Sequence, residues 1–228
     1  GVMAISRTFN RYYTSSVVNI EFEETLFTEN KPGFVFTDIL TDYRGAEWYA
    51  IREYGLFVEN HKSAKIINYT YSKYNPLGIN SNVPQCLFCD KDDNLWIGTF
   101  DGGVNFYSPY RKVFHNIQDN FSETGLMNNK VKTIFQDRDG EIWIGTKVGG
   151  MLSKFDINTK TFKHYRHNPN DPYSISDEYI FAITDAEPGY LWVGTMNEGL
   201  NHFNKATGKS RIFKHDPAFN KSITSNNI

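Results

Sequence analysis

The sequence predicts an all-β fold built from repeated four-stranded antiparallel units, and three features support this. A segment that pairs a tryptophan with a following Gly-Thr recurs along the chain, and its copies hold the only four tryptophans of the protein. The spacing between these tryptophans is 48, 47 and 49 residues: Trp48, Trp96, Trp143 and Trp192. Aromatic residues make up 16% of the chain, which favours strands. Four strands, a period near 48 and a sandwiched tryptophan are typical of a β-propeller blade.

The clearest unit lies between residues 129 and 167, where four strand-like segments alternate with turns. Its second strand is apolar on both faces around Trp143, so we expect it to be covered on both sides. The segment Asp137-Arg138-Asp139-Gly140 before it is a tight turn. The expected strands of this meander are 131–136, 141–146, 151–156 and 162–166.

The other units follow the same order, and the connections between units repeat as well. First strands are expected near 36–41, 85–89 and 180–184. One apolar residue recurs in each connection at intervals of 47, 49 and 48 residues: Ile79, Leu126, Ile175 and Ile223. Truncating a tryptophan buried between two sheets typically costs about 3–5 kcal/mol. Packing therefore explains the repeat before any function is considered.

The repeat divides the chain into about four complete blades with partial blades at both ends. The expected segments are 1–33 (strands three and four of a partial blade), 34–81, 82–128, 129–176 and 177–222 (complete blades) and 223–228 (the start of another blade). The terminal pieces together lack a second strand, so these residues are not expected to close a ring alone. We expect them to be part of a larger propeller of about seven blades.

The composition excludes several classes of function. The 24 basic and 26 acidic residues give no basic surface, so we expect no nucleic-acid contacts from this chain. The chain has no run of about 18 apolar residues, so we expect no membrane span in it. Its first residues do not have the pattern of a signal peptide. Cys86 and Cys89 fall on an expected strand, which favours two structural cysteines over a redox or metal half-site.

Several motifs resemble the two-component regulator propeller repeat. They are Asp-x-Asp-Gly-x-Ile-Trp-Ile-Gly-Thr at 137–146, Gly-Gly-Val at 102–104 and Asn-Pro-Asn-Asp-Pro-x-Ser-Ile-Ser at 168–176. The resemblance implies a periplasmic sensor ectodomain of a hybrid two-component histidine kinase/response regulator. In this family a glycan-derived oligosaccharide sets kinase activity and so controls glycan-utilisation genes. The resemblance covers about 34–228. Two departures stand out: Ala50-Ile51 replaces Gly-Thr, and Glu198 replaces the first glycine of Gly-Gly.

The same resemblance implies the partners of the chain. They are the oligosaccharide, the remaining blades and domains of the same receptor, and a second copy in a receptor homodimer. The kinase module would lie elsewhere in the full-length protein, so we expect this chain not to be an enzyme and to need no cofactor.

Ligand contacts are expected from the variable residues that directly follow Gly-Thr, because loops on a rigid scaffold carry specificity. A sugar ring could lie on Phe100 or Tyr54, with its hydroxyls bound by neighbouring polar side chains. The alternative for each position is an ordinary solvated loop residue. The candidate residues are Arg52, Glu53, Tyr54, Phe100, Asp101, Lys147, Asn197 and Glu198.

Other candidate sites have simpler explanations. The segment from Asp90 to Asn94 resembles the start of a calcium loop, but Leu95 stands where that loop needs glycine, so turn hydrogen bonding by Asp90, Asp92 and Asp139 is the better account. His167 and His215 recur at equivalent places on the fourth strand, which argues for a structural role and against a metal site.

Two other functions remain open at this stage. A propeller glycan lyase or hydrolase would need carboxylates or a His/Tyr pair that converge from separate blades and leave no linear motif. A scaffold propeller that binds protein partners would show a contiguous apolar patch on one face.

Overall fold

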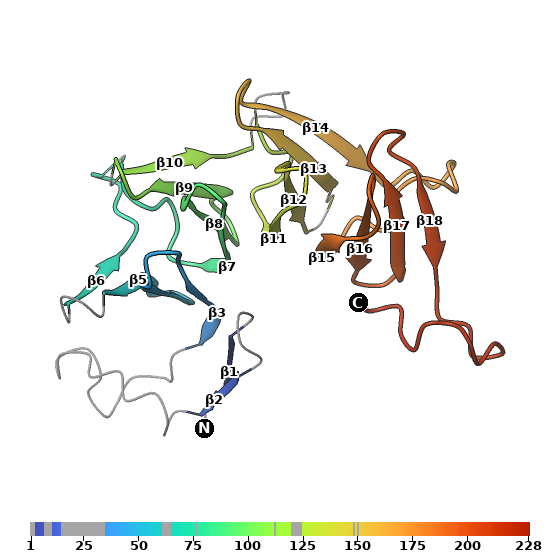
Figure 1. The fold of residues 1–228 in the computed structure, drawn as a ribbon, viewed down its shortest axis with the longest axis horizontal. Coiled ribbons are helices and arrows are strands. Elements are labelled where there is room, and N and C mark those ends of the chain that lie inside the picture. Colours follow the sequence, from blue (N-terminus) through green and yellow to red (C-terminus); the bar gives the residue numbers. More distant parts are fainter. Residues whose placement is uncertain are drawn as a thin grey trace. The chain divides into compact units, whose positions relative to one another are not determined.

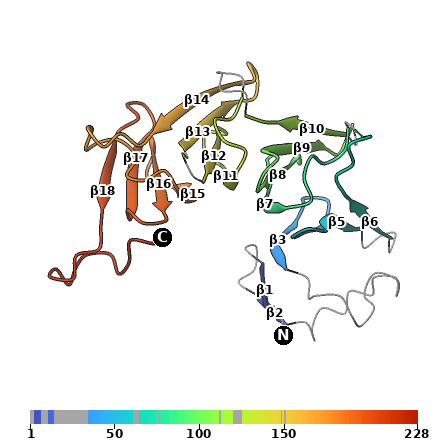
Figure 2. The ribbon, with the colours of Figure 1, turned by 180° about the vertical axis from the view of Figure 1, so that it is seen from behind.

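The structure is a computed structural model, and it describes residues 3–6, 11–14, 35–60, 65–75, 77–111, 113–119, 125–147, 149 and 151–228. Its strands form four four-stranded antiparallel sheets and one two-stranded hairpin. Figures 1 and 2 show the ribbon from opposite sides. The chain divides into two compact units, one of Gly1–Thr99 with Asn105–Asn116 and one of Phe100–Val104 with Ile117–Ile228. The expected all-β fold of four-stranded antiparallel blades is confirmed.

The first unit holds the hairpin and two sheets. The hairpin pairs β1 (Met3–Ser6) with β2 (Arg11–Thr14). One sheet consists of β3 (Phe36–Thr41), β4 (Glu47–Ile51), β5 (Gly55–Asn60) and β6 (Lys65–Tyr69). The other consists of β7 (Pro84–Cys89), β8 (Leu95–Thr99), β9 (Val104–Ser108) and β10 (Val113–Ile117).

The second unit holds the other two sheets, and each is again a meander in chain order. One consists of β11 (Val131–Gln136), β12 (Ile142–Thr146), β13 (Met151–Asp156) and β14 (Thr161–Arg166). The other consists of β15 (Ile180–Asp185), β16 (Tyr190–Thr195), β17 (Leu200–Asn204) and β18 (Ser210–Phe213). The strands expected from the sequence agree with these bounds to within one residue.

A buried aspartate holds the turn before the tryptophan in three sheets. The carboxylate of Asp137 accepts hydrogen bonds from the backbone N–H of Asp139 (3.0 Å) and Glu141 (2.9 Å) and from Trp143 Nε1 (2.9 Å). Asp42 and Asp90 make the equivalent bonds to their own turns and tryptophans. The expected turn-forming role of Asp90 is confirmed, and its bond to the tryptophan explains why the two residues recur six positions apart.

In each unit a tryptophan of one sheet packs against an aromatic ring of the following sheet. In the first unit the ring centroids of Trp48 and Tyr107 lie 5.5 Å apart. In the second unit the Trp143 ring meets Phe203 of the following sheet edge-on, with ring centroids 5.7 Å apart. Trp48, Trp96 and Trp143 are at most 2% exposed, whereas Trp192 is half-buried, since no sheet follows β18 within the described residues. Three of the four tryptophans are therefore buried, and Trp48 and Trp143 have the expected contact with a second sheet.

The glycine of the repeated Gly-Thr lets the next first strand approach closely. A Cβ atom added at Gly145 would lie 2.6 Å from Cγ2 of Ile180, the first residue of β15. At Gly194 it would lie 2.8 Å from Cγ2 of Ile228. Any larger side chain would push the two sheets apart, so this glycine serves packing rather than ligand binding.

Candidate functional site

A buried threonine ties the ends of the loop that follows it. Thr195 Oγ1 lies 2.8 Å from the carbonyl oxygen of Gly199 and accepts from the backbone N–H of Glu198 at 3.2 Å. Thr146 Oγ1 likewise accepts a hydrogen bond from the backbone N–H of Met151 (3.1 Å). Because Thr195 closes its loop, residues 196–198 are held in place while their side chains stay exposed or half-buried.

These loops are hydrogen-bonded to the connections between sheets. The backbone N–H of Met196 donates to the carbonyl of Tyr179 (3.2 Å), and the N–H of Gly199 donates to that of Asn226 (2.9 Å). Lys147 is joined to Lys130 in the same way (2.8 Å). The loops and connections thus lie side by side.

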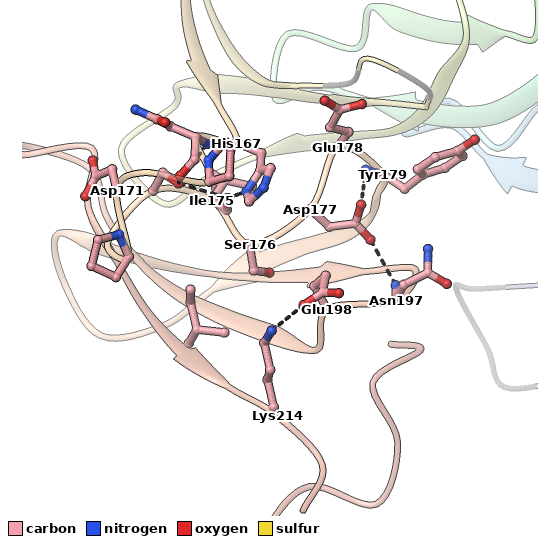
Figure 3. A pocket seen from close by; sticks show the side chains of 15 residues that line it. His167, Asp171, Ile175, Ser176, Asp177, Glu178, Tyr179, Asn197, Glu198 and Lys214 are labelled. Atoms are coloured by element: carbon pink, nitrogen blue, oxygen red, sulfur yellow. Dashed lines mark hydrogen bonds and ion pairs between the residues drawn. The ribbon is translucent and has the colours of Figure 1, made fainter.

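A cleft of about 430 Å³ opens at one of these places, inside the second unit (Figure 3). It lies between the β14–β15 connection and the β16–β17 loop. Residues of the connection from His167 to Tyr179 line one side, and Asn197, Glu198, Ile212 and Lys214 line the other. The size and the mixture of polar and apolar groups suit a small polar ligand with apolar ring faces.

Two separate sets of polar interactions lie around the cleft. The Asp177 carboxylate accepts from the backbone N–H of Tyr179 (3.2 Å) and from that of Asn197 across the cleft (3.0 Å). Glu198 forms an ion pair with Lys214. The carboxylates of the lining outnumber its one lysine, so the cleft carries negative charge. Such a surface favours neutral hydroxyl donors over anions.

Glu178 interrupts a structural position of the repeat. The other three connections have an asparagine there (Asn82, Asn129 and Asn226), and each asparagine Oδ1 accepts from a backbone N–H just after a fourth strand. Glu178 instead accepts from the backbone N–H of Gly149 (3.2 Å), and its side chain is exposed in the cleft. A structural residue has therefore been exchanged for a charged one where the cleft opens.

Phe100 and two lysines form a second cluster in this unit. The Nζ atoms of Lys147 and Lys130 lie 5.5 and 5.8 Å from the centroid of the Phe100 ring, within the range of cation–π contacts. The ring is 41% exposed. This cluster combines an aromatic surface with two positive charges.

The model of the two component regulator propeller family matches residues 78–101 and 125–147. The chain contains two-component regulator propeller repeats. Comparison with curated proteins gives no match.

Solved structures show the same fold at low sequence identity. The extracellular domain of a candidate hybrid two component system from B. thetaiotaomicron is 18% identical, with a TM-score of 0.51 over 96% of this chain and 33% of that one. PorZ, a surface component of the type-IX secretion system of Porphyromonas gingivalis, is 16% identical, with a TM-score of 0.63 over 95% and 31%. Virginiamycin B lyase from Staphylococcus aureus is 11% identical, with a TM-score of 0.61 over 84% and 59%.

This chain therefore spans about a third of the first two structures and 59% of the third. At these identities the likeness establishes the fold, a section of a larger propeller.

The structure places the predicted ligand residues in separate groups. Phe100 and Lys147 are brought together, and Asn197 and Glu198 line the cleft. Asp101 is an exposed residue of the loop that follows β8. Arg52, Glu53 and Tyr54 follow β4 in the first unit, where Arg52 and Glu53 are exposed and Tyr54 is half-buried.

Prediction from the loops alone missed four charged or aromatic residues of the cleft. Asp177, Glu178, Tyr179 and Lys214 were not among the candidates, yet they line it. The replacement of the recurring asparagine by Glu178 is a signal that an alignment of the four connections could have found.

The other motifs have structural roles. His167 and His215 each place Nδ1 2.8 Å from the carbonyl oxygen of the residue eight positions later, which confirms their structural role. They lie just beyond β14 and β18, not on the fourth strand as expected, because the strand pairing ends before them. Cys86 and Cys89 lie on β7, and neither belongs to a disulfide in the described structure.

The described residues contain neither a candidate metal site nor a candidate membrane-spanning helix. No group of three or more His, Cys, Asp or Glu side chains in that part of the chain could hold a metal ion. In the same residues, no helix has the length and apolar character to cross a bilayer.

Proposed function

We propose that this chain is a ligand-sensing section of the periplasmic propeller of a hybrid two-component receptor, and that its cleft binds a glycan-derived oligosaccharide. The propeller repeats and the fold shared with a sensor ectodomain support the receptor assignment. In this proposal, ligand binding changes the activity of a kinase module elsewhere in a homodimeric receptor and so the transcription of glycan-utilisation genes.

The observation that carries the ligand proposal is the coincidence of the cleft with the interruptions of the repeat. Glu178 replaces the recurring asparagine, and Glu198 replaces a glycine of the Gly-Gly pair. Both line the 430 Å³ cleft, together with Asn197 and Tyr179. Carboxylates and amides accept and donate hydrogen bonds to sugar hydroxyls, while the tyrosine ring offers a face for an apolar ring surface.

Calorimetric titration of the complete polypeptide that contains residues 1–228 with an oligosaccharide library tests the proposal. We expect at least one oligosaccharide to bind. The Glu178→Asn variant restores the residue of the other connections, so it should keep the thermal stability but bind that oligosaccharide at least about tenfold more weakly, since a hydrogen bond to a charged group is lost. Glu187→Gln, an exposed turn residue outside the cleft, should bind normally. Absence of binding across the library would refute the ligand assignment.

A propeller lyase is the second candidate, because virginiamycin B lyase shares the fold. The same titrations distinguish the two functions if the mixtures are afterwards analysed for products by mass spectrometry. We propose a sensor and therefore expect the oligosaccharide to be recovered unchanged. Catalytic cleavage would contradict this assignment.

A further inference from the structure

The sheet β15–β18 has one face without a neighbouring sheet within the described residues. Its other face carries Phe203, whose ring packs on Trp143 of the preceding sheet at a centroid distance of 5.7 Å. Trp143, the equivalent of Trp192, is 0% exposed. On the open face, four half-buried rings contact one another in series, with centroids 4.6 to 5.8 Å apart: Tyr190, His202, Trp192 and Phe213. A contiguous set of partly exposed rings of this kind marks an interaction surface.

The connection after β18 is built like the connections that lead into first strands. Asn226 Oδ1 accepts from a backbone N–H just after β18 (2.6 Å), and its carbonyl oxygen accepts from the N–H of Gly199 (2.9 Å). Asn82 and Asn129 make the same pair of bonds, each two residues before a first strand begins (β7 and β11). Ile228, two residues after Asn226, therefore takes the position of the first residue of a further first strand.

Ile228 lies against the open face. A Cβ atom added at Gly194 would lie 2.8 Å from Cγ2 of Ile228, just as one added at Gly145 would lie 2.6 Å from Cγ2 of Ile180. Gly194 follows Trp192 by two residues on β16, so the two residues lie on the same face of the sheet. The contact that joins the sheets β11–β14 and β15–β18 is thus repeated on the open face, which argues for a neighbouring sheet of the same kind.

The indole N–H on the open face lacks the acceptor that the other tryptophans have. In the other three sheets, an aspartate six residues before the tryptophan accepts from Nε1. Ala186 stands at that position before Trp192, and Pro188 lacks the backbone N–H that Asp139 donates to Asp137 in the preceding sheet. Within the described residues, no group accepts a hydrogen bond from Trp192 Nε1. A buried indole N–H usually has a partner, so whatever covers the open face has to supply the acceptor.

We infer that a further four-stranded sheet of the same repeat, in the complete polypeptide, covers the open face. It places a ring against Trp192 and supplies the hydrogen-bond acceptor for Trp192 Nε1. The ring follows from the interfaces within the two units, where third strands contribute it: Tyr107 of β9 lies on Trp48, and Phe203 of β17 lies on Trp143. This inference does not depend on the proposed ligand.

Hydroxyl-radical footprinting of the complete polypeptide, with a residue-by-residue readout by mass spectrometry, measures whether Trp192 is covered. Each rate is divided by that of the free amino acid, so that different rings can be compared. We expect Trp192 to be modified as slowly as Trp143 and about tenfold more slowly than Tyr173, which is 63% exposed. A Trp192 rate closer to that of Tyr173 would overturn the inference.

The same measurement separates the possible occupants of the open face. A sheet of the same polypeptide protects Trp192 at every protein concentration and without added sugar. Protection that is lost on roughly hundredfold dilution would assign the face to a second copy of the chain. Protection that appears only with an oligosaccharide would assign it to a ligand. Either of these results would overturn the inference.

Substitution and indole exchange test the ring and the acceptor. In the complete polypeptide, Trp192→Ala should lower the melting temperature as much as Trp143→Ala does, and the exposed Tyr173→Ala control should leave it unchanged. In NMR spectra of tryptophan-labelled polypeptide, the Trp192 indole N–H is assigned by its loss in Trp192→Phe. It should exchange with deuterium as slowly as that of Trp143. A clearly smaller loss for Trp192→Ala would contradict the covering ring, and rapid exchange would contradict the acceptor.

Discussion

Replacing Asp137 by alanine should be among the most damaging single changes in the second unit. The Asp137 side chain is fully buried, and its carboxylate holds two backbone N–H groups, Trp143 Nε1 and the Nζ of Lys205, which lies 2.6 Å away. Removing it leaves the buried indole N–H without its acceptor, at about 1–3 kcal/mol. Removing one partner of a buried ion pair typically costs about 3–5 kcal/mol. These costs overlap, so we expect a loss of about 3–5 kcal/mol in the free energy of unfolding.

Urea unfolding followed by tryptophan fluorescence measures this loss, and Asp139 supplies the control. Asp139 also pairs with Lys205, but its side chain is 56% exposed. Asp139→Ala should therefore cost no more than about 1 kcal/mol, as exposed ion pairs do. Asp137→Asn keeps the shape but loses the charge, and should lie between the two. If Asp137→Ala cost no more than Asp139→Ala, the buried carboxylate would not be what holds the turn and the tryptophan together.

Three further predictions concern the same sheets. In the 228-residue chain by itself, Trp143→Ala should lower the free energy of unfolding by about 3–5 kcal/mol, whereas Trp192→Ala should lower it by clearly less, because the Trp192 ring is half-buried. Equal losses for the two variants in urea titrations would contradict this account of packing. Gly145→Val should destabilise by about 1–3 kcal/mol or more, because its Cβ would lie 2.6 Å from Ile180, and an unchanged melting temperature by circular dichroism would refute this. Burial by itself would raise the pKa of Asp137, but hydrogen bonds from Lys205, Trp143 and Glu141 outweigh it and hold the pKa below its ordinary value of 3.8. A pKa that is lower in the folded state than in the unfolded state adds stability at a pH above the unfolded-state pKa. This stability is lost as the pH falls through the folded-state pKa. Unfolding titrations should therefore show a loss of free energy of unfolding below about pH 4, and the Asp137→Asn variant should show a smaller loss.

The repeat made most of the fold predictable. The period of the tryptophans and the turn residues between strands are local signals, and they located the sheets from β3 to β18. The bond from Asp137 to Trp143 was not predicted, since a separation of six residues along the chain does not reveal which side chains meet. The half-buried state of Trp192 also depends on what covers the sheet rather than on its own sequence.

The candidate site was predictable only on one side. Variation after Gly-Thr identified Phe100, Lys147, Asn197 and Glu198, and the structure places these in the cluster or the cleft. It did not identify Glu178, because that residue lies in a connection and not after Gly-Thr. An alignment of the connections marks Glu178 as different, but only the structure shows that the equivalent asparagines bind the backbone. The contacts across the cleft depend on how two segments approach each other in space, and sequence spacing does not encode that approach.

Hydrogen–deuterium exchange with and without the tightest-binding oligosaccharide tests the central claim most directly, because it locates the ligand without any substitution. The account predicts slower exchange at residues 176–179 and 196–198, where the connection and the loop line the cleft, and unchanged exchange in β14. Protection confined to β14, with the cleft segments unaffected, would contradict the claim that the interrupted repeat positions form the binding site.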